Sequence, residues 1–469
     1  MKRCLMNALI SALLVALVVP MAFAGGSGER DAGPERVTIS LWAGNAPPDG
    51  PDRYRALNLI TALERMQAEM RQEGREITLV ADAVSDPAGW TEFKRRFALS
   101  AEAGEAPDIV VSGHTDVALW AQSGYIVPVA DSVAEVQAMY PQFADVIEPF
   151  WDSVTWNGKI WGVPQDTEAR PMYFNKVLLR RMGWSDAEIN SLPDRIRSGE
   201  FTLDDLIKTA QDGIAQGVVK PGYGYWHRPS AGGDFTQFYV AFGGEIYDAA
   251  SDQLVISREP LRKFFDFHRR VVTTGITPEN FIGTSWDVWH DTVVNHDVLF
   301  FNAGVWSWAG WAVNNAAGGE AELFEKFGYA LQPSGIPGES GVTLSHPVVY
   351  MACSERATRR SNQDLVIRAI AHMTDTDLNT RHAVISAHTA ILNSQLDDPD
   401  YLAAEFLSDV SYMADYNYFA PNHPSYGQWF DVVYRTMVSV QAGEITPEQG
   451  VSEAVQRLQH ELGDALVVR

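Results

Sequence analysis

The sequence predicts an α/β protein that folds as two or more compact units, and three observations support this prediction. The chain has 469 residues, more than a single hydrophobic core usually organises. Short apolar runs alternate with helical patterns of apolar residues, as they do in α/β proteins. About a third of the way along the chain, Pro164 and Pro171 keep a polar stretch extended. Such a stretch can carry the chain from one unit to another.

The first part of the chain shows this alternation most clearly. Apolar runs predict strands, and amphipathic patterns predict the helices between them. In chain order the predicted elements are a strand at 37–41, a helix at 57–73, a strand at 77–80, a helix at 90–103, a strand at 109–111 and a helix that ends at Ser123-Gly124. A parallel sheet requires this order, because parallel strands need a crossover connection.

Residues 156–184, which include this polar stretch, contain several turn and helix signals. Asn157-Gly158 predicts a tight turn, since both residues tolerate positive φ. A strand is expected up to Val163 and a second one through 173–174. A helix is expected from Lys176, with Gly183 as its stop.

Further helices are predicted beyond residue 200. Thr202 is expected to cap the helix that begins with Leu203, and a helical pattern covers 259–274. Thr446 followed by Pro447 predicts the start of a terminal helix, because proline is favoured at the first helical position.

Residues 156–176 resemble the first interlobe crossing of the extracellular solute-binding proteins of ABC importers, specifically the maltodextrin-binding type. The family pattern is aromatic-x-Gly-Lys-x-aromatic-Gly-Val/Leu-Pro, a polar hinge, then Tyr/Phe-Asn-Lys. The matching residues are Trp156, Gly158, Lys159, Trp161, Gly162, Val163, Pro164, Phe174, Asn175 and Lys176. Shorter matches at 104–110, 121–128 and 202–206 follow in the family's order.

This resemblance implies two lobes, each a mainly parallel sheet flanked by helices, joined by three hinge crossings. Lobe 1 would hold residues 35–166 with 346–392, and lobe 2 would hold 167–345 with 393–469. The crossings would lie near 165–172, 345–348 and 392–396. The ligand would bind in the cleft between the lobes.

The N-terminus has the features of a cleaved signal peptide at residues 1–24. Lys2 and Arg3 precede an apolar run at 5–19, and Ala22-Phe23-Ala24 forms a small-x-small cleavage signature. A membrane anchor is the alternative, but this run is shorter than the roughly 20 residues that a spanning helix needs. We therefore expect a periplasmic protein. Its only cysteine after cleavage would be Cys353, so no internal disulfide is expected.

The composition limits the class of partner. The formal net charge of −24 argues against nucleic acid or anionic lipid, because phosphates require a basic surface. The chain has 14 Trp residues, and tryptophans in polar, Gly-rich loops are typical of carbohydrate recognition.

The candidate ligand residues lie in loops between the predicted elements, where open α/β sheets bind ligands. The resemblance assigns Glu168 to an acidic contact and Trp306, in the Asn302-x-Gly304-x-Trp306 loop, to sugar stacking. Gly232-Gly233 should permit a close backbone approach. The full set of candidates is Trp42, Asn45, His114, Asp116, Glu168, Arg170, Trp226, Asp234, Trp306, Asn422 and His423.

Several of these residues have structural alternatives. Glu168 and Arg170 can pair with each other, and His114 with Asp116 can serve as a helix cap. Trp226 and Asp234 can equally have a structural role, and Asn422 with His423 can be turn chemistry beside proline.

The expected function is binding of a carbohydrate and its delivery to an ABC permease, by a monomer without metal or cofactor. Arg170 raises the alternative of an anionic sugar or sugar phosphate, and an iron or polyamine binder of similar build stays open. A secreted carbohydrate-active hydrolase is the alternative from another class. Enzyme signals are weak, because the sequence has no His-Glu-x-x-His, no Gly-x-Ser-x-Gly and no Walker phosphate loop.

Overall fold

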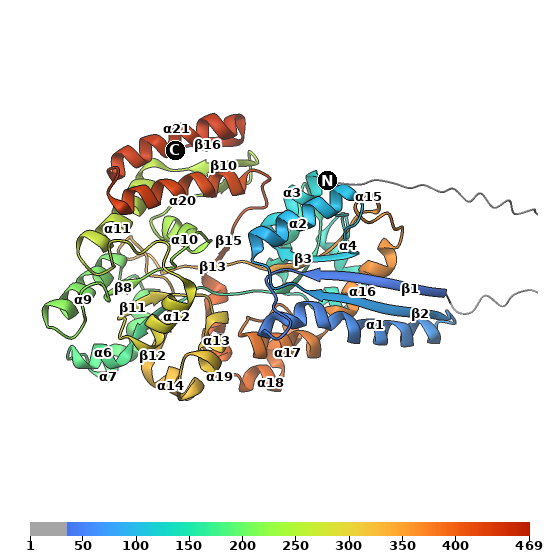
Figure 1. Ribbon diagram of the computed structural model, residues 1–469, viewed down its shortest axis with the longest axis horizontal. Helices are drawn as coiled ribbons and strands as arrows, with labels where there is room; N and C mark the ends of the chain where they lie inside the picture. The colour runs from blue at the N-terminus through green and yellow to red at the C-terminus, as the bar shows by residue number, and fades with distance from the viewer. Residues whose placement is uncertain (1–34) are drawn as a thin grey trace, which may run out of the picture.

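The computed structural model describes residues 35–469 and contains two hydrophobic cores, one on each side of the molecule (Figure 1). The first core draws on residues between 39 and 163 and between 348 and 392. The second draws on residues between 169 and 331 and between 383 and 462. The predicted signal peptide lies outside the described residues. Within 35–469, no helix is both long and apolar enough to cross a bilayer.

The first core surrounds a five-stranded sheet. Its strand order is β2 (Ile77–Ser85), β1 (Glu35–Ala43), β3 (Ile109–Gly113), β14 (Val348–Ala352) and β6 (Val163–Asp166). Strand β1 pairs parallel with β2 and β3, whereas β14 pairs antiparallel with β3 and β6. β3 is buried along its whole length, as expected for a strand covered on both faces.

Helices cover both faces of this sheet. Those of this lobe are α1 (Tyr54–Gln72), α2 (Trp90–Ala103), α3 (Val117–Gln122), α4 (Val133–Met139), α5 (Pro141–Ala144), α15 (Glu355–Thr358) and α16 (Gln363–Met373), with short turns η1 (Pro51–Arg53), η2 (His114–Asp116) and η3 (Glu148–Val154). The hairpin β4 (Thr155–Trp156) and β5 (Lys159–Ile160) leads into β6.

The second core surrounds a four-stranded sheet of order β12 (Phe327–Ala330), β7 (Met172–Asn175), β11 (Phe300–Asn302) and β8 (Tyr225–Trp226). β11 pairs parallel with β8, and β7 pairs antiparallel with β11 and β12. A smaller sheet of β16 (Leu466–Val468), β10 (Gln253–Ile256) and β9 (Tyr247–Asp248) lies beside it. Parallel pairs therefore occur in both lobes, but each main sheet is mixed.

The helices of the second lobe are α6 (Lys176–Arg181), α7 (Asp186–Asn190), α8 (Leu192–Arg197), α9 (Leu203–Ala215), α10 (Asp234–Ala241), α11 (Arg258–Thr273), α12 (Trp286–Asn295), α13 (Trp306–Asn314), α14 (Gly319–Lys326), α18 (Pro399–Ala403), α19 (Glu405–Val410), α20 (Tyr426–Ala442) and α21 (Pro447–Leu462). Further short turns are η4 (Asn393–Asp397), η5 (Ser411–Tyr416) and η6 (Gly463–Ala465).

Several chain segments pass between the two cores. One connects β6 to β7, and β13 (Thr343–Ser345) leads directly into β14. After α17 (Thr376–Ser386), Thr389 donates its backbone N–H to the carbonyl of Thr167 at 2.9 Å. β15 (Asn417–Phe419) pairs parallel with β13. β13 and β15 lie side by side between the lobes in Figure 1.

The local predictions agree closely with the structure. The predicted helix at 90–103 has the bounds of α2. Thr202 caps α9 in a capping box with Asp205, and Thr446 caps α21 in another. Asn157 and Gly158 both have positive φ in the turn between β4 and β5. These signals were readable because they depend on neighbouring residues alone.

Candidate binding site

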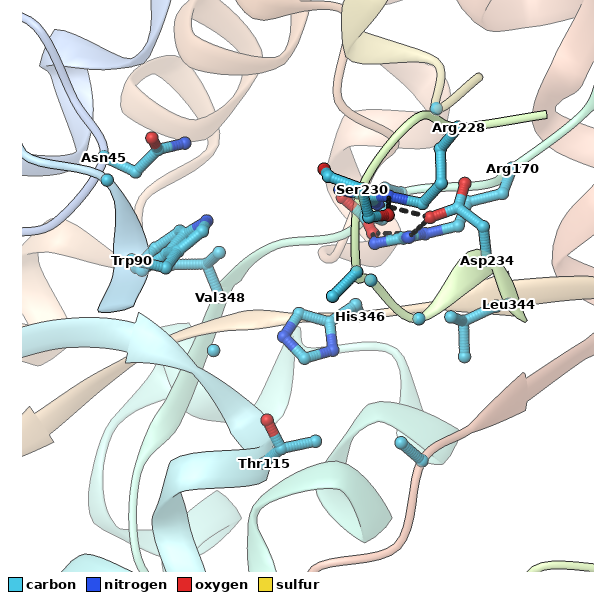
Figure 2. Close-up of a pocket in the computed structure, with 18 of the residues that line it drawn as sticks. Asn45, Trp90, Thr115, Arg170, Arg228, Ser230, Asp234, Leu344, His346 and Val348 are labelled. Atoms are coloured by element: carbon cyan, nitrogen blue, oxygen red, sulfur yellow. Dashed lines mark hydrogen bonds and ion pairs between the residues drawn. The ribbon is translucent and has the colours of Figure 1, made fainter. Parts of the chain in front are cut away.

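A cavity of about 1170 Å³ lies between the two lobes and is lined by residues of both (Figure 2). Lobe 1 contributes the loop after β1, the start of α2 and the turn after β3. Lobe 2 contributes the loop before α10 and the starts of α12, α13 and α20. Loops at strand ends are where α/β sheets commonly bind ligands.

A group of paired charges forms the lobe-2 wall of this cavity; we call Glu168, Arg170, Arg228 and Asp234 the cavity cluster. Arg170 donates from Nε to Glu168 at 2.9 Å and from Nη1 to Asp234. Arg228 donates to the same Asp234 carboxylate and, from Nε, to the carbonyl of Ser230 at 2.9 Å. Figure 2 shows the two guanidinium groups meeting at Asp234.

Glycines allow this arrangement. A Cβ at Gly232 would overlap the guanidinium of Arg228, and one at Gly233 would press on Leu344. The expectation that Gly232-Gly233 permits a close approach is therefore confirmed, although the group that approaches is a side chain of the cavity wall.

Burial affects the two carboxyl groups of the cavity cluster differently. Burial desolvates Glu168 and raises its pKa to about 7. The positive charge of Arg170 opposes this rise, but the negative charge of Asp234 adds to it. Burial also disfavours the charged form of Asp234, but Arg170 and Arg228 together outweigh it and lower that pKa to about 2. Near neutral pH, Glu168 can thus either accept or donate a hydrogen bond.

Aromatic rings lie next to this cluster. The guanidinium of Arg170 lies 5.1 Å from the ring centre of Trp306, and that of Arg228 lies 5.2 Å from that of Trp286. Trp306 is the first residue of α13, and its indole folds back over Gly304, where a Cβ would overlap the ring. The Gly-x-Trp spacing therefore fixes the position of this tryptophan.

The lobe-1 wall is also polar. Lys94 pairs with Asp116 at 2.8 Å, and the hydroxyl of Ser112 donates to the same carboxylate at 2.6 Å. Asn45 has positive φ and presents an exposed amide to the cavity. Burial holds the pKa of His346 well below its usual range, so this ring is neutral near pH 7.

A second group of charged and titratable residues extends from the cavity wall to the place where the chain passes between the lobes; we call Asp52, Arg55, Asp166, His382 and His388 the hinge cluster. Asp52, Arg55 and His388 line the cavity. Arg55 lies 2.8 Å from Asp166, 3.3 Å from Asp52 and 3.0 Å from Nε2 of His388. His382 is 2.7 Å from Asp166. The two carboxylates and two histidines have ligand atoms within 4.8 Å of one another, as a metal site would, but the Arg55 guanidinium bonds three of them.

Comparison with known proteins identifies the family. A sequence model described as bacterial extracellular solute-binding protein matches residues 62–352. This chain belongs to that family. Among solved structures, the GacH receptor of Streptomyces glaucescens GLA.O is 14% identical, covering 91% of this chain and 98% of that one with a TM-score of 0.69.

Two further solute-binding proteins have a similar fold. Maltose-bound MalE3 of T. maritima is 17% identical over 90% of this chain and 99% of that one, with a TM-score of 0.68. The sugar-binding protein MalE of Xanthomonas citri is 17% identical over 90% and 97%, with a TM-score of 0.68. The predicted two-lobed α/β fold and the predicted family are therefore confirmed.

Six of the residues predicted from the sequence line the cavity of this solute-binding protein. They are Asn45, Asp116, Glu168, Arg170, Asp234 and Trp306. The structural alternative also holds for two of them, since Glu168 and Arg170 pair with each other while facing the cavity.

Five predicted residues do not line the cavity, and each has a structural partner instead. Trp226 is buried in the lobe-2 core, where its indole N–H donates to the carbonyl of Gly222 at 2.7 Å. His114 is fully buried, and its Nε2 lies 2.9 Å from the carbonyl of Ala420. Trp42 packs against the lobe-1 core.

The remaining two belong to the segment before α20. The side-chain amide of Asn422 donates to the carbonyl of Ser153 at 2.6 Å, which ties this segment to lobe 1. His423 accepts from the backbone N–H of Ser425 at 3.1 Å. Both residues therefore shape the turn.

Sequence reasoning missed several lining residues, among them Trp90, Arg228, Trp286, His346 and Tyr426. Arg228 lies between the candidates Trp226 and Asp234 in the sequence, but no local pattern indicates that its side chain faces the cavity. The hinge cluster was missed because its members are far apart in sequence: Arg55 and Asp166 are 111 residues apart.

Proposed function

We propose that this solute-binding protein is the substrate-binding component of an ABC importer and that it binds a carbohydrate in the cavity between its lobes. The observation that carries the proposal is the cavity wall itself. It combines paired charges, which offer both donors and acceptors, with the rings of Trp306 and Trp286. Sugars need both, because their hydroxyls form hydrogen bonds while their C–H faces pack on aromatic rings.

The charge balance of the cavity favours a neutral carbohydrate. Arg170, which raised the possibility of an anionic ligand, already pairs with Glu168 and Asp234. Arg55 and Lys94 are paired as well. A carboxylate or phosphate on the ligand would compete with these internal partners for the arginine and lysine groups. A neutral hydroxyl can form a hydrogen bond to the same groups without displacing their partners.

The related structures support the choice of ligand class. The GacH receptor was solved in complex with acarbose and an acarbose homologue, and MalE3 was solved with maltose. Both ligands are neutral or weakly basic saccharides with many hydroxyls. At 14% and 17% identity, these structures share the fold of this chain.

We also propose the lobes as 35–166 with 346–392 and 167–345 with 393–469. The two separate hydrophobic cores support this division except near the third crossing, where Ala383, Ala387 and Ala390 pack in the second core. A signal peptide at residues 1–24 would direct the protein to the periplasm. There a monomer would close on its ligand and dock on the membrane permease.

A thermal-shift screen tests the proposal. The panel contains maltose, maltotriose, acarbose and D-tagatose, with glucuronate and a sugar phosphate as anionic probes. We expect a neutral saccharide to raise the melting temperature, because a ligand that binds only the folded state stabilises it. A rise with the anionic probes alone would contradict the neutral ligand.

Product analysis then separates a binding protein from a hydrolase. The best saccharide of the panel is incubated with the protein and analysed by chromatography. We expect it to be recovered intact, and cleavage would support the hydrolase. Small-angle scattering with and without this saccharide should show a smaller radius of gyration in the bound state, and identical profiles would contradict lobe closure.

A further inference from the structure

His388 connects the ligand cavity to the chain crossings. It lines the cavity just after α17, next to Thr389, whose backbone N–H bonds Thr167 of the first crossing. Its ring is nearly parallel to that of Trp306, at 15° and 6.2 Å between centres. His388 therefore touches both the candidate sugar-stacking ring and the place where two crossings meet.

The neighbours of His388 determine its protonation. Arg55 is always a donor, so Nε2 of His388, 3.0 Å away, must accept. Nδ1 then carries the proton and donates to the hydroxyl of Ser386 at 2.8 Å. That hydroxyl in turn donates to the carbonyl of His382 at 2.7 Å. The chain of bonds is consistent only for a neutral ring with its proton on Nδ1.

His382 also contacts the His388 ring, on the side linked to Asp166. His382 stacks on it at 25° and 5.3 Å, and His382 lies 2.7 Å from Asp166. Arg55 is anchored to Asp166, the last residue of β6, where the first crossing begins. A shift of either crossing would move Arg55 or Ser386 relative to the ring.

We propose that His388 is a positioning residue, which holds the indole of Trp306 in the cavity and couples its orientation to the chain crossings between the lobes. The part of this inference that concerns sugar affinity rests on the proposed function. The part that concerns the orientation of Trp306 does not.

The coupling implies a response to acid. The charged and titratable groups around the His388 ring are Arg55 from α1, Asp52 from η1, Asp166 from β6 and His382 from α17. Burial lowers the pKa of His388 to about 4. Below that pH, protonated Nε2 can no longer accept from Arg55, and the ring should leave its position.

The test uses the fluorescence of Trp306 in the ligand-free protein, obtained as the difference between the parent and Trp306→Phe. Ser386→Ala removes the acceptor of the Nδ1 proton but keeps both rings. His388→Phe keeps an aromatic ring but loses both hydrogen bonds. If His388 positions Trp306, acrylamide quenching of Trp306 should rise in both variants, since one lost hydrogen bond shifts a local equilibrium by about 2- to 10-fold.

If His388 only packed against Trp306, acrylamide quenching in His388→Phe would stay as in the parent, because the phenyl ring would still cover the indole. Unchanged quenching in both variants would overturn the inference. If His388→Phe fails to fold by circular dichroism, the result for Ser386→Ala alone decides. His296→Gln, which alters an exposed histidine on lobe 2, is the matched control.

The pH profile provides a second readout. In the parent, the Trp306 signal should change as the pH falls through about 4, and His388→Phe should lack this step. Persistence of the step in His388→Phe would contradict the assignment to His388.

Maltotriose binding tests separately whether the position of Trp306 affects sugar affinity. Weaker binding by Ser386→Ala would link positioning to affinity. If the parent does not bind maltotriose but the quenching and pH results hold, His388 still positions Trp306 and only the proposed ligand fails.

Discussion

The cavity cluster and the hinge cluster are both built around a buried arginine, but their charges are balanced differently. In the cavity cluster two guanidinium groups share one carboxylate, Asp234, and Arg170 has Glu168 as well. In the hinge cluster Arg55 alone faces Asp166, Asp52 and a neutral histidine. If Arg170 or Arg228 turns to a ligand, Asp234 therefore keeps the other arginine as its partner. The hinge cluster has no second cation to compensate for a loss.

Glu168 of the cavity cluster and His388 of the hinge cluster respond to pH in opposite directions. Glu168 has a raised pKa and so binds a proton more tightly in the folded state than in the unfolded state. His388 has a lowered pKa and binds a proton less tightly when folded. Raising the pH thus weakens the first contribution and strengthens the second. The following changes test this difference, from the largest expected effect to the smallest.

Asp166→Ala should cause the largest loss of stability. It leaves the buried guanidinium of Arg55 without its closest carboxylate, and breaking a buried ion pair costs about 3–5 kcal/mol. Urea unfolding measures the loss. Asp131→Ala is the control, because Asp131 pairs with Lys159 at the surface and an exposed pair contributes about 0.5 kcal/mol. Equal losses of unfolding free energy in both variants would contradict a large contribution of the buried Arg55–Asp166 pair to stability.

Glu168→Gln should change how stability depends on pH. Burial raises the folded-state pKa of Glu168 from 4.5 to about 7. Its favourable contribution is therefore complete below pH 4.5 and is lost as the pH rises through 7. Between those values the parent should lose about 1–3 kcal/mol relative to Glu168→Gln.

Unfolding free energies of both proteins across this range provide the measurement. The buried histidines contribute with the opposite sign, so the difference between the two proteins isolates the carboxyl group. Parallel curves for the parent and the variant would mean that Glu168 titrates as an ordinary carboxyl.

Arg228→Met should have the smallest effect on stability, about 1 kcal/mol or less. Arg228 is partly exposed, and Asp234 retains Arg170 as its partner. The same urea experiment measures it. A loss as large as that of Asp166→Ala would contradict the idea that the cavity cluster has a reserve of charge.

The fold was predictable from the sequence where the signals are local. The caps at Thr202 and Thr446 and the turn at Asn157-Gly158 depend on residues a few positions apart, and all were confirmed. The pairing of β14 between β3 and β6 was not predictable in the same way. It depends on chain segments that meet only after the crossings are formed.

The site was predictable only in part, for the same reason. The Gly304-x-Trp306 spacing marked a ring that does line the cavity. Trp226 has an equally polar, Gly-rich context, yet it is the last residue of β8 and is buried in the core. Whether a loop tryptophan faces solvent or core depends on the packing of distant residues, which composition does not reveal.

The most direct test of the account is a calorimetric titration of Trp306→Ala with the saccharide that stabilises the parent most. Trp42→Ala is the matched control, because Trp42 packs against the lobe-1 core outside the cavity. We expect Trp306→Ala to lose about 2–4 kcal/mol of binding free energy, as removal of a buried aromatic anchor does, while Trp42→Ala keeps the parent's affinity. An unchanged dissociation constant for a folded Trp306→Ala would contradict the assignment of this cavity as the carbohydrate site.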